Sequence, residues 1–381
     1  MSMIHQLSAE TIHEFTVNTL QQQIDLEMSG YRIDNRLAWD VLLKASSEYR
    51  SISSVCAELD DSVHHNTLRL QLNQRFDVST LQRDESAMNA TLAALIPQSI
   101  RGQAVNVAID FHDEPYYGKN PENRTYVCRT KAKAGTTRFW RVATAYVMKH
   151  GQRVTLAIRY VLPEYKTLDI VQMLLWRVQQ QGVRIKGLYM DKGFCSTAVI
   201  NYLQARQLKA VIACPIRGKT GGTKALCEGK ASYTTAYCFT DGTPATICCV
   251  RTKVPDRHGK KRVKWLLYVT INVNWTPRTV KKRYRRRFGI EASYRQMRQL
   301  RLFSTSRNPA LRFFMYGLAF VLLNIWTLLR WKCTRHPGKR RIDKAVFPLA
   351  RFKGFIRRTI ERIRGVIDTI PSYIPLQVLK L

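Results

Sequence analysis

The segment Ala104–Phe111, AVNVAIDF, alternates apolar and polar side chains and carries an aspartate near its end. This alternation predicts a β-strand with one buried side. Two further strands are predicted shortly after it, Phe139–Met148 and Val154–Leu162, and their short separation suits an antiparallel meander. A helical pattern then covers Thr167–Gln181 and ends at Gly182, the residue type expected after a helix.

The next three elements complete the order of the sheet. They are a strand at Val183–Met190, a helix at Ser196–Arg206 and a strand at Leu208–Cys214. Three strands, helix, strand, helix, strand is the ribonuclease H-like order, so the predicted fold class is α/β with a mixed sheet. Residues 215–275 contain β patterns and glycine turns, and they predict a β-rich insertion before helical patterns resume at Pro277. The predicted sheet domain spans residues 98–335.

The regions outside this domain have different patterns. Residues 1–97 are mostly helical in pattern and form a predicted N-terminal domain. Within it, Ile52–Leu59 and Val63–Leu72 flank a polar break, as in a DNA-binding helix-turn-helix, and a small helical bundle that packs on the sheet domain is the alternative. Residues 336–381 are predicted to form a basic, helical C-terminal tail.

Charge and cysteine content limit the class of partner. The formal net charge is +35, and residues 1–100 carry 7 Lys and Arg against 13 Asp and Glu, so the positive excess lies after residue 100. Such a surface favours a polyanionic partner such as nucleic acid or an anionic membrane surface. Nine cysteines without a Cys-x-x-Cys pair, and the lack of a hydrophobic leader at Met1–Gln22, predict reduced thiols inside a cell and argue against zinc.

One apolar run raises the alternative of a membrane span. Phe313–Leu329, FFMYGLAFVLLNIWTLL, approaches the length of about 20 residues that a span requires. It is isolated and contains Asn324 and Thr327. We therefore expect a helix buried in a large core, and no membrane partner.

Three acidic residues are predicted to converge. Asp110 lies near the end of the first strand, Asp191 directly follows the fourth, and Glu291 is the single Asp or Glu between Arg257 and Ile342. The first and fourth strands are neighbours in a ribonuclease H-like sheet, so both aspartates reach one edge. Three carboxylates suit two Mg²⁺ ions, which at about 4 Å apart can clamp both oxygens of a phosphodiester displacement. Asp113 or Glu114 would replace Asp110 if the strand ended later.

The surroundings of Glu291 are strongly basic. In an unbroken α-helix Tyr284, Arg287, Glu291 and Arg298 would share one stripe, on which the arginines could hold phosphate oxygens. Gly289 lies within this stretch and marks a place where the helix could kink.

These residues resemble a known signature. Tyr284-x2-Arg287-x3-Glu291-x6-Arg298 resembles the YREK signature of DDE transposases from the large insertion-sequence family numbered four, with arginine at the usual lysine position. Asp191-Lys192-Gly193-Phe194 is similar to that family's second motif, and Asp110 with Gly118-Lys119 to its first. The resemblance covers residues 104–332, and this family also carries a β insertion between the second Asp and the Glu.

The resemblance implies a function. Such an enzyme binds the terminal inverted repeats of its own element, cuts the ends by metal-assisted hydrolysis and joins them to target DNA. It implies Asp110, Asp191 and Glu291 as ligands of two Mg²⁺ ions, with Mn²⁺ as a substitute, and DNA contacts from Tyr284, Arg287, Arg298, Lys192 and Lys119. It further implies a homodimer or higher oligomer that synapses double-stranded DNA ends in the cytoplasm of a prokaryotic cell, at the nucleoid. A nuclease without strand transfer and a non-catalytic DNA-binding derivative are the alternatives.

Overall fold

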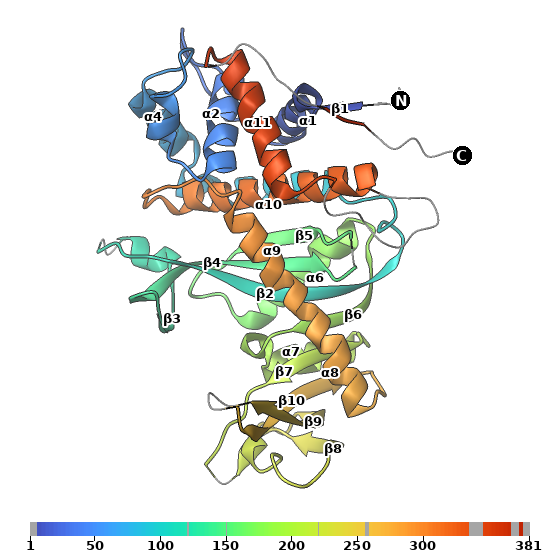
Figure 1. The fold of residues 1–381 in the computed structure, drawn as a ribbon. Helices are drawn as coiled ribbons and strands as arrows, with labels where there is room; N and C mark the ends of the chain where they lie inside the picture. Colours follow the sequence, from blue (N-terminus) through green and yellow to red (C-terminus); the bar gives the residue numbers. More distant parts are fainter. Residues whose placement is uncertain are drawn as a thin grey trace.

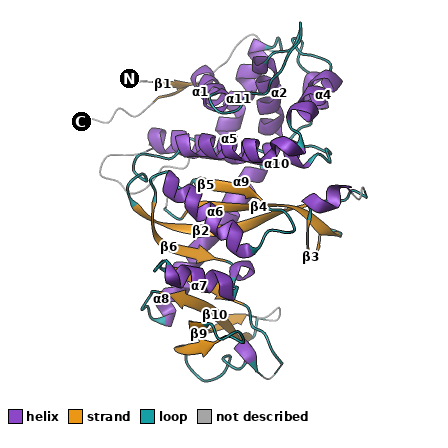
Figure 2. Ribbon diagram, turned by 180° about the vertical axis from the view of Figure 1, so that it is seen from behind, coloured by secondary structure: helices purple, strands orange, loops and turns teal. Residues whose placement is uncertain are grey.

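The computed structural model describes residues 6–119, 122–149, 151–219, 221–255, 259–334, 346–366 and 373–375. A large mixed sheet crosses the molecule, with helices on both faces and a helical layer at one end (Figures 1 and 2). Its strands are β2 (Ala104–Pro115), β3 (Cys128–Lys133), β4 (Thr136–Val147), β5 (Thr155–Tyr160), β6 (Arg184–Met190), β7 (Ala210–Cys214), β8 (Tyr233–Cys238), β9 (Pro244–Pro255) and β10 (Lys261–Ile271).

The sheet contains the predicted order. Its neighbours run β3-β4-β2-β6-β7-β10-β9-β8, and β5 pairs with the same side of β4 as β3 does. Within it, β5, β4 and β2 are antiparallel, whereas β2, β6 and β7 are parallel. The protein is therefore a mixed α/β structure whose central five strands are consistent with a ribonuclease H-like fold.

Two details differ from the sequence prediction. Strand β2 continues to Pro115, because residues after Phe111 still pair with Phe139–Val142 of β4. Strand β3 was not predicted, since its sequence, CRTKAK, lacks apolar alternation. Within residues 215–275, where the β-rich insertion is predicted, β8, β9 and β10 form, and β10 pairs with β7 so that they extend the same sheet.

The two faces of the sheet have different partners. Helices α6 (Thr167–Gln180) and α7 (Thr197–Ala205) cover one face, and α5 (Leu81–Ala94), α9 (Gly289–Arg298) and α10 (Pro309–Thr334) cover the other. Side chains alternate between faces along β2. Val107 and Ile109 belong to the core beneath α6 and α7, while Ala108 belongs to the core beneath α10. Asp110 therefore faces the side of α9.

Helix α10 contains the apolar run. It is long and apolar enough to cross a membrane by length and composition, and 89% of its most apolar window is buried inside the protein. Asn324 is fully buried there: its side chain accepts from the Thr155 amide at 2.9 Å and donates to the Thr155 carbonyl at 2.8 Å. The polar residue that interrupts the run thus bonds to strand β5.

The helical layer combines both ends of the chain. It contains α1 (Ala9–Gln21), α2 (Asn35–Glu48), α3 (Ile52–Cys56), α4 (His65–Arg75) and α11 (Leu349–Ile363). Helix α11 packs against α1 and α2, and β1 (Gln6–Ser8) pairs with β11 (Tyr373–Pro375). Residues 349–363 of the predicted tail are therefore an ordered part of this layer. Residues 335–345, 367–372 and 376–381 lie outside the described residues.

The predicted helix-turn-helix corresponds to α3 and α4. Helix α3 has 5 residues, and its partner α4 begins at His65, two residues later than predicted. His64, Asn66, Thr67 and Arg69 are exposed, as a DNA-reading helix would need. Whether this element contacts DNA stays a prediction.

Candidate active site

Asp110, Asp191 and Glu291 lie around one guanidinium. Arg287 Nη1 donates to Asp110 Oδ2 at 2.6 Å. Its other terminal nitrogen, Nη2, lies 3.8 Å from Asp191 Oδ1 and 3.6 Å from Glu291 Oε1. A residue of β2, the residue that follows β6 and a residue of α9, up to 181 positions apart in sequence, thus meet at a single side chain.

The site is closed on one side and open on the other. Only 4% of the Arg287 side chain is exposed, against 15% for Asp110, 38% for Asp191 and 51% for Glu291. The buried guanidinium therefore forms the floor of the site, and solvent exposure increases from Asp110 through Asp191 to Glu291. Arg287 Nε is buried without a hydrogen-bond partner among the described residues.

Burial and charge act against each other here. Burial raises the pKa of Asp110 to about 6, although Arg287 lowers it, and the nearby Asp191 raises it further. For Arg287, burial opposes the charged form, but Tyr284, Asp110 and Asp191 outweigh burial and raise its pKa. The pair therefore holds a permanent cation beside a carboxylate that can take up a proton near neutral pH.

The helix that carries Glu291 is interrupted before it. Helix α8 (Pro277–Arg285) leads into a 3₁₀ turn, η5 (Arg286–Phe288), and α9 begins at Gly289. A Cβ at Gly289 would lie 3.1 Å from Arg153 Nη1, so the chain passes close to that side chain. Because a 3₁₀ turn advances by 120° per residue, the single exposed stripe expected from an α-helix does not form. Tyr284 and Arg287 are buried, whereas Glu291 and Arg298 are exposed.

Two tyrosines fix the strands that carry the aspartates. The buried Tyr284 hydroxyl donates to the Met190 carbonyl at 3.2 Å, one residue before Asp191. Tyr294 donates to the Asp110 carbonyl at 3.2 Å and shares a 2.7 Å hydrogen bond with Thr144. Tyr294 was not predicted as a residue of the site. It lies three residues after Glu291, on the inner side of α9, and this helical spacing is the sequence signal that could have identified it.

The other predicted DNA contacts lie on the surface. Arg298 is exposed at the end of α9, and Lys192 is exposed directly after Asp191. Lys119 is exposed beyond the end of β2 and makes no hydrogen bond or ion pair with a described residue of the triad. Their contacts with DNA stay predictions, as do those of the buried Tyr284 and Arg287.

The alternative acids near Asp110 have partners of their own. Asp113 pairs with Arg141, with one oxygen 2.7 Å from Arg141 Nε, and its other oxygen lies 3.3 Å from Lys133 Nζ. Glu114 pairs with Arg301. Although β2 ends later than predicted, Asp110 is the acid of this strand that contacts Arg287.

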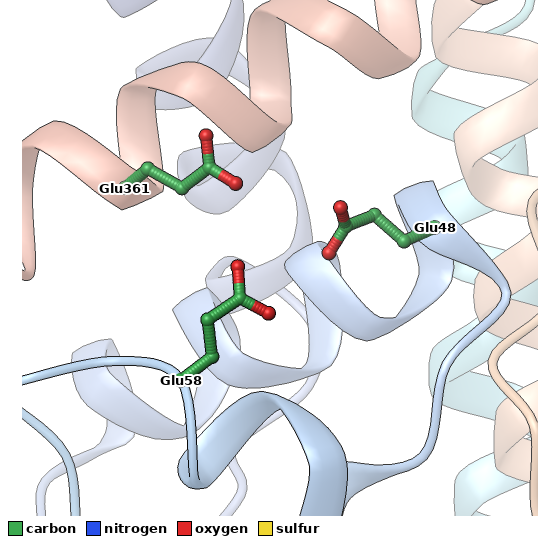
Figure 3. A group of neighbouring side chains, drawn as sticks. All are labelled: Glu48, Glu58 and Glu361. Carbon is green, nitrogen blue, oxygen red and sulfur yellow. The ribbon is translucent and has the colours of Figure 1, made fainter. Parts of the chain in front are cut away.

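A second acidic group lies far from this site, in the helical layer. Glu48 of α2, Glu58 two residues after α3, and Glu361 of α11 point toward one another (Figure 3). One carboxylate oxygen from each lies within 4.8 Å of the others, and this is the group of three such ligands found among the described residues. Lys44 Nζ lies 3.1, 2.9 and 2.5 Å from them, respectively. A lysine ammonium already compensates these carboxylates, so this group is a buried ionic contact rather than a metal site.

The triad does suit divalent cations. Its three carboxylates supply the oxygen ligands that Mg²⁺ prefers. Unlike the glutamates around Lys44, two of them, Asp191 and Glu291, lie 3.8 and 3.6 Å from their cation and are 38% and 51% exposed, so their oxygens are open to an ion. The three carboxylates are less closely gathered than the glutamates of the helical layer, because the Arg287 side chain lies among them. The residues present therefore fit a metal-dependent reaction.

Comparison with known proteins gives a consistent result. The family model described as transposase DDE domain matches residues 112–325, which include Asp191 and Glu291 and begin two residues after Asp110. No curated protein matches. Among solved structures, the cryo-EM structure of the piggyBac transposase synaptic complex with hairpin DNA is similar, with a TM-score of 0.57 and 11% identity over 94% of this chain and 77% of that chain. At this identity the likeness concerns the fold.

Proposed function

We propose, because this chain belongs to the transposase DDE domain family, that it cuts DNA at the ends of its own mobile element and joins those ends to target DNA. The observation that carries this proposal is the convergence of Asp110, Asp191 and Glu291 on Arg287. Such a cluster, half open to solvent, can bring metal ions to a scissile phosphate. We also propose that this chain belongs to the insertion-sequence subfamily with the YREK-type signature.

The carboxylates would hold two Mg²⁺ ions, with Mn²⁺ as a substitute. When bound, the ions polarise the phosphodiester and activate water or a 3′ hydroxyl as the nucleophile. Arg287 holds Asp110 in place from the floor of the site, and Tyr284 and Tyr294 fix the ends of the strands. Arg298, Lys192 and Lys119 are exposed, and we propose that they contact phosphate oxygens.

The proposed partner is double-stranded DNA, both as element end and as target. The net charge of +35 favours this partner, because DNA is a polyanion. The structurally similar piggyBac protein was solved as a synaptic complex with hairpin DNA. By analogy of fold, we propose that two or more copies of this chain bring two terminal inverted repeats together, at the nucleoid in the cytoplasm of a prokaryotic cell.

Incubation of the purified protein with labelled duplexes that contain an element end tests this function. We expect cutting with Mg²⁺ or Mn²⁺ and none with EDTA, and a joined product when target DNA is added. Glu291→Gln keeps the shape of the side chain but removes its charge, so it should largely abolish cutting and leave DNA binding intact or tighter. Glu228→Gln, the same change at an exposed residue of the insertion, is the matched control.

Each other outcome has a defined meaning. Cutting without joining would identify a nuclease, and binding without cutting by the wild type would identify a non-catalytic derivative. If Glu291→Gln cut DNA at the normal rate, Glu291 would not be a ligand of the metals.

A further inference from the structure

Helix α11 has two chemically distinct faces. Its buried face consists of Leu349, Phe352, Phe355, Ile356 and Ile360, which pack toward α1 and α2. Its outer face is basic and carries Arg351, Lys353, Arg357, Arg358 and Arg362. The apolar side is thus already used by the fold. Arg357 pairs with Glu48 and Glu361, and Arg362 pairs with Glu10, so the other three cations remain available for another molecule.

A hollow of about 570 Å³ lies along this outer face, between the end of α2 and the first half of α11. The residues that line it include Glu48, Arg351, Lys353, Gly354, Arg357 and Arg358. The hollow therefore has four cationic side chains against one carboxylate.

That carboxylate is already neutralised. Glu48 oxygens lie 3.1 Å from Lys44, 3.5 Å from Arg50 and 3.9 Å from Arg357. By contrast, Arg351, Lys353 and Arg358 form no ion pair with any residue that the structure describes. Burial lowers the pKa of Lys353, and Glu48 offsets this only in part. The hollow is therefore short of negative charge.

Gly354 keeps the hollow open. It lies inside α11, its φ is not positive, and a Cβ built on it would meet nothing within 4 Å. Neither a turn nor close packing against a residue that the structure describes requires glycine at this position. Glycine in a helix interior lowers stability relative to alanine. Gly354 weakens the helix and leaves open space beside cations that have no ion pair. This combination suits a position that an external partner approaches closely.

We infer that this hollow binds the sugar-phosphate backbone of duplex DNA. The inference rests on the proposed function and adds a DNA contact outside the triad. Arginine and lysine are the residues that position DNA through its phosphates. A membrane surface fits less well, because the apolar face of α11 is buried in the protein. Figures 1 and 2 place α11 on the same side of the molecule as α8 and α9, so one duplex could contact both.

Binding of an element-end duplex by the full chain tests the inference across a range of salt concentrations. Arg358→Ala should weaken binding and reduce the slope of log affinity against log salt by about 1, the loss of one phosphate contact. Gly354→Ala should raise the melting temperature and yet weaken binding severalfold, since a methyl group fills the floor of the hollow. A purely structural role of Gly354 would not produce these two opposite effects together.

The controls separate this inference from the proposed function. Arg206→Ala removes an exposed cation at the end of α7, far from α11, and should leave both affinity and slope nearly unchanged. If the wild type failed to bind the duplex, the proposed function would fail as well. If the wild type bound and Gly354→Ala and Arg358→Ala bound equally well, this inference alone would be overturned. Loss of binding to phosphatidylglycerol vesicles in these variants, with duplex binding unchanged, would also overturn it.

Discussion

At the scale of single residues, Arg287 determines the electrostatics of the site. It is the buried cation that contacts all three carboxylates, and its removal would leave the largely buried Asp110 with the Phe111 amide but without a cationic partner. Breaking a buried ion pair by removal of one partner costs about 3–5 kcal/mol. The Arg287 guanidinium places beside the three carboxylates a positive charge of the kind that bound metal ions would also supply.

Arg287→Ala should therefore lower the melting temperature in EDTA, and Mg²⁺ should restore more stability to the variant than it adds to the wild type. The reason is that divalent cations can replace the lost positive charge. Thermal unfolding with EDTA and with Mg²⁺ measures this difference. Arg301→Ala, which removes the partner of Glu114 outside the triad, should lose stability without such recovery. Equal Mg²⁺ effects in both variants would contradict the metal role of the triad.

The raised pKa of Asp110 gives a pH dependence of defined sign. Its pKa is about 6 in the folded protein against an ordinary 3.8, so between these values the folded state binds a proton that the unfolded chain has released. From this group alone, the free energy of unfolding falls as pH rises, by up to about 3 kcal/mol. Below pH 4 the contribution is fully present, and above pH 6 it is lost.

Asp110→Asn removes this titration. In EDTA, the stability of this variant relative to the wild type should increase between pH 4.5 and 7, on the order of 1–3 kcal/mol. Urea unfolding at both pH values measures it, and the exposed Glu228→Gln serves as a reference with no such trend. A constant difference between Asp110→Asn and wild type would mean that Asp110 stays ionised throughout.

At the scale of elements, the outer edge of β5 shows how helices complete the sheet. Asn324 of α10 bonds to both backbone groups of Thr155, and Asn89 of α5 bonds to both of Ile158, at 2.8–2.9 Å. Glu85 accepts from the Tyr160 amide at 2.9 Å. An edge strand would otherwise expose unpaired donors and acceptors, so these side chains take the place of a further strand.

Asn324→Leu should destabilise the protein, although the volume and apolar character of a leucine side chain suit the surrounding core. The change leaves the buried amide and carbonyl of Thr155 unpaired, at about 1–3 kcal/mol for each group. Chemical denaturation measures the loss. Leu323→Met, a substitution of similar volume at the neighbouring buried position, should cost less than about 1.5 kcal/mol. A loss no larger than in this control would show that water satisfies Thr155.

The elements differ in how far the sequence could predict them. The strands at 104–111, 139–148 and 183–190 were predictable because apolar and polar residues alternate or run continuously and glycine marks their ends. Strand β3 was not, because its stability comes from pairing with β4 rather than from apolar alternation. The sequence marked Gly289 as a place where the helix could kink, and α9 does begin there, but the 3₁₀ turn that precedes it was not predicted. The convergence of the triad carboxylates followed from strand order, but the central place of Arg287 did not.

At the scale of the whole molecule, early and late segments of the chain pack together: β1 pairs with β11, and α11 packs against α1 and α2. The predicted basic tail instead contributes α11 to the helical layer, because the spacing of Phe352, Phe355, Ile356 and Ile360 places them on one side of a helix. The sequence contained this period, yet the partner surface could not be identified, since it lies more than 300 residues earlier. Lys44 and Glu361, 317 positions apart, show how specific this contact is.

A chain that ends at Pro337 should therefore lose its folded helical layer rather than only its affinity for DNA. It would expose the apolar face that α11 covers on α1 and α2, and burial of each large apolar side chain contributes about 1.5–3 kcal/mol. Five such residues approach the whole stability of a typical domain, about 5–15 kcal/mol. It would also remove Arg364, which lies 2.6 Å from the fully buried Asp40, and so leave that carboxylate with less compensation. Thermal unfolding and limited proteolysis should show a lower melting temperature and early cleavage within residues 9–75, whereas a chain that ends after Pro375 keeps α11 and should behave as the wild type. An unchanged melting temperature of the shorter chain would mean that α11 contributes nothing to the fold, and its apolar face would then need another partner.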